Sequence, residues 1–191
     1  IYVYNGNPAK PSTLDSHTFN SEQYAYCVLR GYHGQYQGYV CTKAFKRSII
    51  IDNNLRVYED IAYNEDRLFV MRYICLCSKV LCLDYQFYMY HLRDDSAMGM
   101  NNKIISQKSI TELYAFQRII DCIKQSNFID KTRLIRHANY AILLSSDILL
   151  SKCTSHDLSK EIKNIKSSVP FGYRLWYYGL DFIKQLIHII H

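Results

Sequence analysis

The chain has 191 residues, of which 49% are hydrophobic and 14% aromatic, and it carries a formal net charge of +6 at pH 7. A chain of this length and composition can bury a core, which excludes an intrinsically disordered segment. Residues 1–100 carry 10 basic and 10 acidic side chains, whereas residues 101–191 carry 13 and 7, so the excess positive charge lies in the second part. The basic residues are dispersed and match no nucleic-acid-binding motif, so no nucleic-acid partner is predicted.

Seven cysteines are spread along the chain. An odd number in mostly apolar surroundings indicates reduced thiols and a reducing compartment, so we expect a cytoplasmic protein. Cys75, Cys77 and Cys82 are close in sequence, but no neighbouring histidine or cysteine completes a zinc-binding spacing. No apolar run reaches about 18 residues without a charge, so no transmembrane helix is expected.

The first part of the chain is predicted to mix strands and helices, with glycine and proline marking the turns. In chain order we expect a strand (1–4), a loop (5–16), a helix from Ser21 to Gly31, a turn (34–38), a short strand (39–40) and a helix (43–51).

The stretch 58–98 organises the rest of the chain. We expect a helix capped by Asn64, because an asparagine side-chain oxygen can accept an orphan backbone N–H. Glu65 and Asp66 follow in the first turn, where the helix dipole favours negative charge. The apolar face of this helix is predicted to consist of Leu68, Phe69, Tyr73, Ile74 and Cys77. Residues 79–84 and 87–90 are predicted to form two neighbouring strands.

From Lys103 onwards only helices are predicted. Ser109 and Glu112 fit a capping box at the start of the first one. The apolar faces are expected to be Leu113, Phe116, Ile120 and Ile123, and then Leu134, Ile135, Ala138, Ala141, Ile142, Ile148 and Leu149. A short lysine-rich helix (157–165) and, after Pro170, an apolar and aromatic helix (171–191) follow. Helices after strands predict a helix-rich α+β fold, or a piece of an α/β fold.

Five segments occur in a fixed order between residues 38 and 98. They are Lys43–Ser48, which is basic and aromatic; Asn54–Leu55–Arg56; Glu65–Asp66–Arg67–Leu68–Phe69; Val80 to Asp84; and Tyr88 to Ser96, which reads Tyr-x-Tyr-x-x-Arg-x-x-Ser. Their order and spacing resemble the C-terminal half of the catalytic domain of family 2 glycosyltransferases. These are inverting enzymes with the GT-A fold, and bacterial members build surface polysaccharides. The family often has glycine where this chain has Asn64, and both residues cap helices.

The resemblance implies that residues 1–100 are the C-terminal, acceptor-side part of the catalytic domain and that residues 101–191 are a helical extension. The parent enzyme would transfer a sugar from a nucleoside-diphosphate sugar to a saccharide or lipid-linked acceptor in surface polysaccharide synthesis. A divalent metal, Mn²⁺ or Mg²⁺, is expected in the full-length enzyme, with ligands outside this chain. We find no Asp-x-Asp motif in the family's position and no Gly-rich phosphate loop, so the 191-residue chain alone is expected to be inactive.

In the family, the aspartate of the Glu-Asp pair is the general base, and here it corresponds to Asp66, supported by Glu65. A second interpretation is that both acids only complement a helix N-terminus, and the sequence does not separate the two. The candidate substrate-binding residues are Lys43, Tyr63, His91 and Arg93. His91 is also a candidate metal ligand, although a lone histidine on a strand more often packs or hydrogen-bonds. Lys43 belongs to a basic amphipathic stretch, which is usually the solvated face of a helix. Arg93 fits equally a contact with phosphate and a solvated cluster with Asp94 and Asp95.

The alternative function is a non-catalytic helical module that docks to a partner or a membrane. Residues 101–191 hold the excess positive charge, and residues 171–190 are rich in aromatic and aliphatic side chains. Such a segment suits the inner face of an anionic membrane, which the lipid-linked acceptors of the family would require. The competing expectation is that this last helix packs on the domain's own core or pairs with a second copy in a homodimer.

Overall fold

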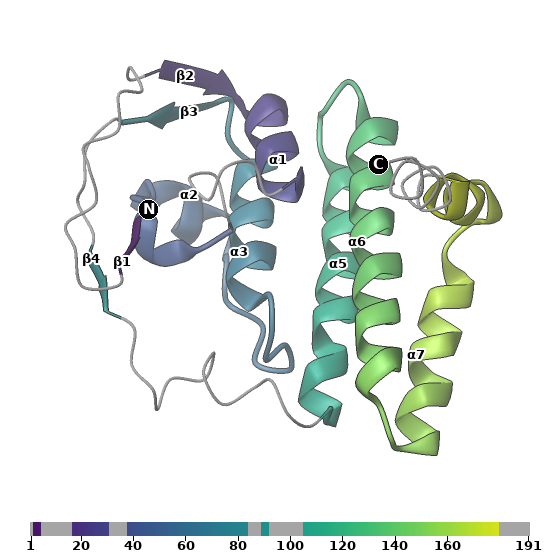
Figure 1. The fold of residues 1–191 in the computed structure, drawn as a ribbon. Helices are drawn as coiled ribbons and strands as arrows, with labels where there is room; N and C mark the ends of the chain where they lie inside the picture. The colour runs from purple at the N-terminus through teal and green to yellow at the C-terminus, as the bar shows by residue number, and fades with distance from the viewer. Residues whose placement is uncertain (1, 5–16, 31–37, 84–88, 92–104, 180–191) are drawn as a thin grey trace.

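The computed structural model describes residues 2–4, 17–30, 38–83, 89–91 and 105–179 (Figure 1). In chain order the elements are β1 (Tyr2–Tyr4), β2 (His17–Asn20), α1 (Ser21–Arg30), a 3-10 turn η1 (Val40–Thr42), α2 (Arg47–Asp52), α3 (Glu65–Ile74), β3 (Lys79–Cys82), β4 (Met89–His91), α5 (Gln107–Gln125), α6 (Lys131–Lys152) and α7 (His156–Ser168). Residues 171–179 are also helical. The strands form two-stranded sheets, so the helix-rich α+β prediction is confirmed.

The helices α5 and α6 form the middle of the molecule, with α1 and α3 on one side and α7 on the other (Figure 1). The strands lie beyond α1 and α3, on the far side from α7. The chain turns back between Gln125 and Lys131, so α5 and α6 run in opposite directions. None of the helices described here is both long enough and apolar enough to span a bilayer.

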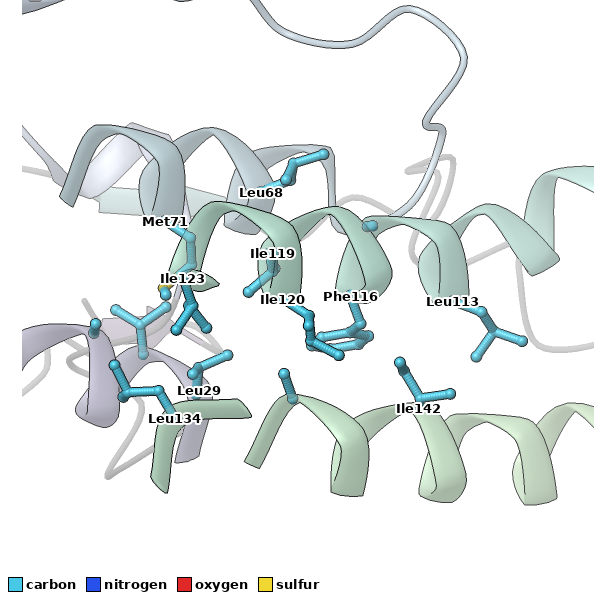
Figure 2. Packing of buried hydrophobic residues seen from close by; sticks show 14 of the residues in the cluster. Leu29, Leu68, Met71, Leu113, Phe116, Ile119, Ile120, Ile123, Leu134 and Ile142 are labelled. Carbon is cyan, nitrogen blue, oxygen red and sulfur yellow. The ribbon is translucent and has the colours of Figure 1, made fainter. Parts of the chain in front are cut away.

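One apolar core joins α1, α3, α5, α6 and α7 (Figure 2). The largest fully buried side chains include Phe116, Leu113, Ile119 and Ile123 of α5, Leu134, Ile142 and Leu143 of α6, and Leu68, Met71 and Ile74 of α3. They recur every three or four residues, which places them on one face of each helix. The helical periodicity predicted for α5, for most of α6 and for α1 is therefore confirmed. On α6, Ile148 is an exception, because it is 47% exposed.

The predicted pairing of the strands 79–84 and 87–90 is wrong. β3 pairs antiparallel with β2, with Phe19 opposite Val80, and β4 pairs parallel with β1, with Val3 opposite Tyr90. The reason is the packing of α1 against α3: β2 precedes α1 and β3 follows α3, so both strands meet at one end of this helix pair. At that end of the helix pair, Ser21 N donates a hydrogen bond to Ser78 O at 3.2 Å.

Two predictions before residue 60 are also wrong. Residues 39–40 are no strand, because Val40–Thr42 forms a 3-10 turn. The helix predicted over 43–51 begins only at Arg47, and Lys43 lies before it in extended backbone. The late start is fixed by a distant residue: the Tyr73 hydroxyl of α3 accepts a hydrogen bond from Lys46 N at 2.8 Å. No local pattern encodes that contact.

The capping box predicted for α5 is one turn too late. Ser106 is the N-cap, and its backbone N donates to Ser109 Oγ at 3.2 Å, so Ser109 is the partner in the box. Glu112 is thereby released from capping and faces α3 instead, where Asn64 Nδ2 donates to Glu112 Oε2 at 3.4 Å. The lysine-rich helix predicted over 157–165 is confirmed as α7, which is longer and spans His156–Ser168.

Candidate functional site

The site predicted from the sequence lies where α3 begins, and Asn64 shapes it. Asn64 has a left-handed backbone, with φ 63° and ψ 18°, and its side chain caps no backbone group. The predicted side-chain cap is therefore wrong, because this backbone turns the amide toward Glu112 of α5. The carbonyl of Asn64 still accepts the first helical bond, from Leu68 N at 2.9 Å. Glycine and asparagine are the residues that tolerate this conformation best.

Asp66 connects the first turn of α3 to the 3-10 turn η1. Its Oδ2 accepts a hydrogen bond from Val40 N at 3.2 Å, and its side chain is half-buried. Both Glu65 and Asp66 lie in the first turn, as predicted. The N-terminal end of α3 and the Val40 backbone N–H both present positive partial charge to this carboxylate.

Gly38 lets the segment before η1 lie directly on α3. A Cβ added to Gly38 would be 2.5 Å from Arg67 Cβ and 2.7 Å from Arg67 Cα. Atoms of the helix itself cannot yield easily, so a side chain at position 38 would displace the segment. This close approach is what brings Val40 within hydrogen-bond distance of Asp66.

Lys43 lies beside this carboxylate. Its Nζ donates to Tyr39 O at 2.7 Å and to Thr42 Oγ1 at 3.2 Å. Burial lowers the pKa of Lys43 to about 8, against the opposing effect of the charges of Cys41, Asp66 and Cys82. Lys43, predicted to bind substrate, is therefore not a solvated residue on a helix face. It is a partly buried amine with a pKa of about 8.

Three charged side chains, Glu65, Arg67 and Glu112, are partly buried around the start of α3. Burial raises the pKa of Glu65, and the charge of Asp66 adds to this increase. Burial also raises the pKa of Glu112, while the neighbouring Arg67 opposes the shift. The Arg67 guanidinium carbon lies 5.5 Å from the centre of the Phe116 ring, and burial lowers the pKa of this arginine. Arg67 therefore links the site to the apolar core shown in Figure 2.

The other predicted site residues are less well placed. Tyr63 is half-buried next to the helix start, and its backbone N donates to Thr111 Oγ1 of α5 at 3.2 Å. The backbone of His91 pairs with Tyr4 in the parallel ladder, but its side chain lies outside the described part of the chain, as does all of Arg93. The structure brings together Glu65, Asp66 and Lys43.

The earlier acidic pair, Glu59–Asp60, has a different role. Asp60 receives two hydrogen bonds from Arg118 of α5, at 2.9 Å and 2.5 Å, and these lower its pKa. The Arg118 guanidinium also lies 4.4 Å from the centre of the Tyr58 ring. Asp60 thereby anchors the loop before α3 to α5.

Sequence reasoning missed Gly38, Arg67 and Glu112 as parts of this site. Arg67 lies inside the motif that carries the family resemblance, so its position was the one available signal. Gly38 and Glu112 act through contacts with distant segments, and nothing in their local sequence indicates these partners.

The residues described here offer no metal site. Within those ranges no three histidine, cysteine, aspartate or glutamate side chains gather in a group that could hold an ion. Burial raises the pKa of Cys75 to about 12 and that of Cys82 to about 11, which keeps both as thiols.

No protein-family model, no curated protein and no solved structure matches this chain.

Proposed function

We propose that this chain is the acceptor-side part of an inverting family 2 glycosyltransferase with the GT-A fold, and that Asp66 is its general base. The observation that carries the proposal is the position of the Asp66 carboxylate: half-buried at a helix N-terminus, fixed by Val40 N, and close to Lys43. Such a group is held in place at the start of a helix, as a base must be. In this proposal the parent enzyme acts in the cytoplasm, at the inner face of the membrane.

The proposed reaction combines one proton transfer with one displacement at the anomeric carbon. Asp66 Oδ1 takes the proton of the acceptor hydroxyl, the hydroxyl oxygen forms a bond to the anomeric carbon, and the bond to the nucleoside diphosphate breaks with its electron pair on the leaving phosphate. Attack from the face opposite the leaving group inverts the anomeric configuration. Lys43 is close enough to interact electrostatically with Asp66, and Glu65, the residue before Asp66, accepts a hydrogen bond from the acceptor sugar.

The left-handed backbone at Asn64 supports the proposal. The family often has glycine at this position, and glycine and asparagine are the residues that adopt positive φ at low cost. The φ of 63° at Asn64 gives a physical reason why either residue suits the position. The departure from the family pattern is thus conservative in backbone terms.

The parallel pair of β1 and β4 gives a second kind of support. Within the described residues each of these strands has the other as its one partner. Parallel sheets occur mostly as larger sheets covered on both faces by helices. In the proposal, the nucleotide-binding strands of the parent enzyme extend this sheet, as the GT-A fold requires.

The reaction can be tested with the parent polypeptide, a panel of nucleoside-diphosphate sugars and saccharide acceptors. We expect release of nucleoside diphosphate and a product of inverted anomeric configuration, read by NMR. Asp66→Asn should lower the turnover by about 10²–10⁴-fold, the usual contribution of a positioned base. A product of retained configuration would contradict a base mechanism and with it the assignment of Asp66.

A second candidate function, docking of the C-terminal part to a membrane, has its own observation. In the helical segment 171–179, Phe171 is 69% exposed, Leu175 62% and Tyr178 46%. Exposed aromatic side chains next to basic ones such as Arg174 suit the headgroup region of an anionic bilayer. Co-sedimentation with vesicles tests this: binding should need anionic lipid and fall when residues 171–191 are removed. Equal binding to neutral vesicles would favour packing on the core or on a second copy.

A further inference from the structure

Tyr26 of α1 is surrounded by basic side chains at the end of the molecule away from Asp66. Arg30 Nη1 donates to the Tyr26 hydroxyl at 2.9 Å, and the Arg133 guanidinium carbon of α6 lies 3.7 Å from the centre of the ring. His137 of α6 contacts the same ring edge-on, with centres 5.0 Å apart. One turn away, Arg136 lies 5.7 Å from the centre of the Trp176 ring. Stacking on aromatic rings holds the arginines in defined positions.

The two titratable rings of this cluster report a positive local potential. Hydrogen bonding from Arg133, reinforced by Arg30, lowers the pKa of Tyr26, although burial opposes the shift. Burial lowers the pKa of His137, and the charges of Arg30, Arg133 and Arg136 lower it further. The charged side chains acting on both rings are therefore arginines. A negative group placed here would be stabilised, and a further positive charge would not.

A groove begins at this cluster. It has a volume of about 660 Å³ and runs between β2, α1 and the start of α6. Its lining includes Phe19, Ile129 and Leu134 as apolar residues, and Tyr26 and Arg133 as polar ones. Ile129 is 95% exposed and Phe19 is partly buried, so apolar side chains border the groove.

Two carboxylates also line the groove, and both accept hydrogen bonds from backbone N–H groups. Glu22 accepts from Ile129 N at 2.7 Å and from Asp130 N at 2.8 Å. Asp130 caps α6 by accepting from Arg133 N at 2.9 Å. Both carboxylates act on Arg133, whereas neither is among the charges that shift the rings of Tyr26 and His137. The positive potential is therefore located on the Tyr26 side of the groove.

We propose that Arg30 and Arg133 at Tyr26, together with Arg136 one turn further along α6, form a binding site for a phosphate group, and that the adjoining groove holds the apolar body which carries the phosphate. Guanidinium groups match phosphate oxygens in geometry and charge. The ligand class is a phosphate or diphosphate ester with an apolar substituent, either the headgroup of an anionic lipid or a soluble ester. The site is independent of Asp66 and of the function proposed for it.

Calorimetry with inorganic pyrophosphate tests the site on the 191-residue chain at low ionic strength. We expect saturable binding with a Kd below about 1 mM, and about tenfold weaker binding for Arg133→Gln. Arg133 is exposed, so this variant should fold, which circular dichroism checks. Arg47→Gln, which removes an exposed arginine from α2, is the matched control for net charge and should bind as the parent does.

His137 provides a second readout, located at the proposed site itself. Bound pyrophosphate offsets the nearby arginine charges, so the pKa of His137, followed by NMR and assigned with His137→Gln, should rise on binding. The ligand source follows from vesicles: if it is a lipid headgroup, Arg133→Gln also weakens binding to phosphatidylglycerol vesicles, and if it is a soluble ester, vesicle binding does not change. Equal effects of Arg133→Gln and Arg47→Gln in both assays, or an unmoved His137, would overturn the proposal.

Discussion

Leu113 and Leu143, in the interface of α5 and α6, are fully buried, whereas Asp66 at the start of α3 and Lys43 between η1 and α2 are half-buried and charged. The first region is held by apolar burial spread over many side chains. The second is held by a few polar contacts between segments that are distant in sequence, such as Val40 with Asp66. The stabilisation from apolar burial grows with the buried area and depends little on exact geometry, whereas each hydrogen bond requires one geometry.

This difference suggests a division of labour within the fold. The helical core stabilises the fold and keeps α3 in place. The partly buried charges at the start of α3 lower the free energy of unfolding. Buried charges that lack ideal partners destabilise a protein, so their retention at one end of one helix is typical of a functional site. Substitutions in both regions can sharpen or break the comparison.

The largest effect is expected in the core. Leu143→Ala should lower the free energy of unfolding by about 3 kcal/mol, because it removes a fully buried side chain and leaves a cavity. Its neighbour Leu144 is 41% exposed, so Leu144→Ala should lower it by less than about 1 kcal/mol. Urea denaturation of both variants measures the difference. Equal losses would mean that the face of α6 carrying Leu144 is also part of a buried interface.

A smaller loss is expected where the chain lies on α3. Gly38→Ala places a Cβ 2.5 Å from Arg67 Cβ, and relieving this overlap should lower the free energy of unfolding by about 2 kcal/mol. Gly172, in the helical segment 171–179, has no atom within 4 Å of an added Cβ. Gly172→Ala should therefore raise stability by about 0.5–1 kcal/mol through helix propensity. A neutral Gly38→Ala would show that the contact with Arg67 is loose.

The partly buried amine should make stability depend on pH. Folded Lys43 loses its proton near pH 8, whereas in the unfolded chain it keeps the proton up to about pH 10.5. Between these values the unfolded state binds more protons, so the stability of the parent should rise relative to Lys43→Met, by about 1.4 kcal/mol per pH unit at most. Below pH 8 the difference should be constant. Urea denaturation of both proteins between pH 7 and pH 9.5 measures it, and parallel curves would place Lys43 in water.

The smallest effect is expected at Asn64. Asn64→Ala puts a Cβ-bearing residue without a polar side chain at φ 63°, which should lower stability by about 1 kcal/mol. Asn64→Gly should change it by only a few tenths of a kcal/mol, because glycine adopts this backbone freely but loses the contact with Glu112. Thermal denaturation distinguishes them. If alanine and glycine behave alike, the left-handed backbone is not what selects asparagine here.

The comparison also explains which parts could be predicted from the sequence. The helical faces could be, because Phe116, Ile120 and Ile123 repeat at the helical period, and this period needs no knowledge of the partner helix. The strand pairing could not, because β2 and β3 are brought together by helices that lie between them in the sequence. The capping box of α5 was placed one turn late because Ser106 and Ser109 both suit a cap.

At the candidate site, the sequence located Glu65 and Asp66 in the first turn of α3, because acidic residues before an apolar period mark a helix start. It could not reveal that Val40 N would hold Asp66, or that Lys43 would be buried, since both depend on how η1 packs on α3. The wrong prediction for the Asn64 side chain has the same origin: its partner Glu112 belongs to α5.

In the proposed glycosyltransferase, Asp66 serves catalysis and Asp60 serves structure. One paired measurement tests this: the rate of sugar transfer and the free energy of unfolding of the parent polypeptide carrying Asp66→Asn or Asp60→Asn. We predict that Asp66→Asn folds with nearly the parent stability and loses about 10²–10⁴-fold in transfer rate. Asp60→Asn breaks the pair with Arg118 and should be less stable but transfer at the parent rate. A parent transfer rate for Asp66→Asn would show that Asp66 is only an acid at a helix N-terminus.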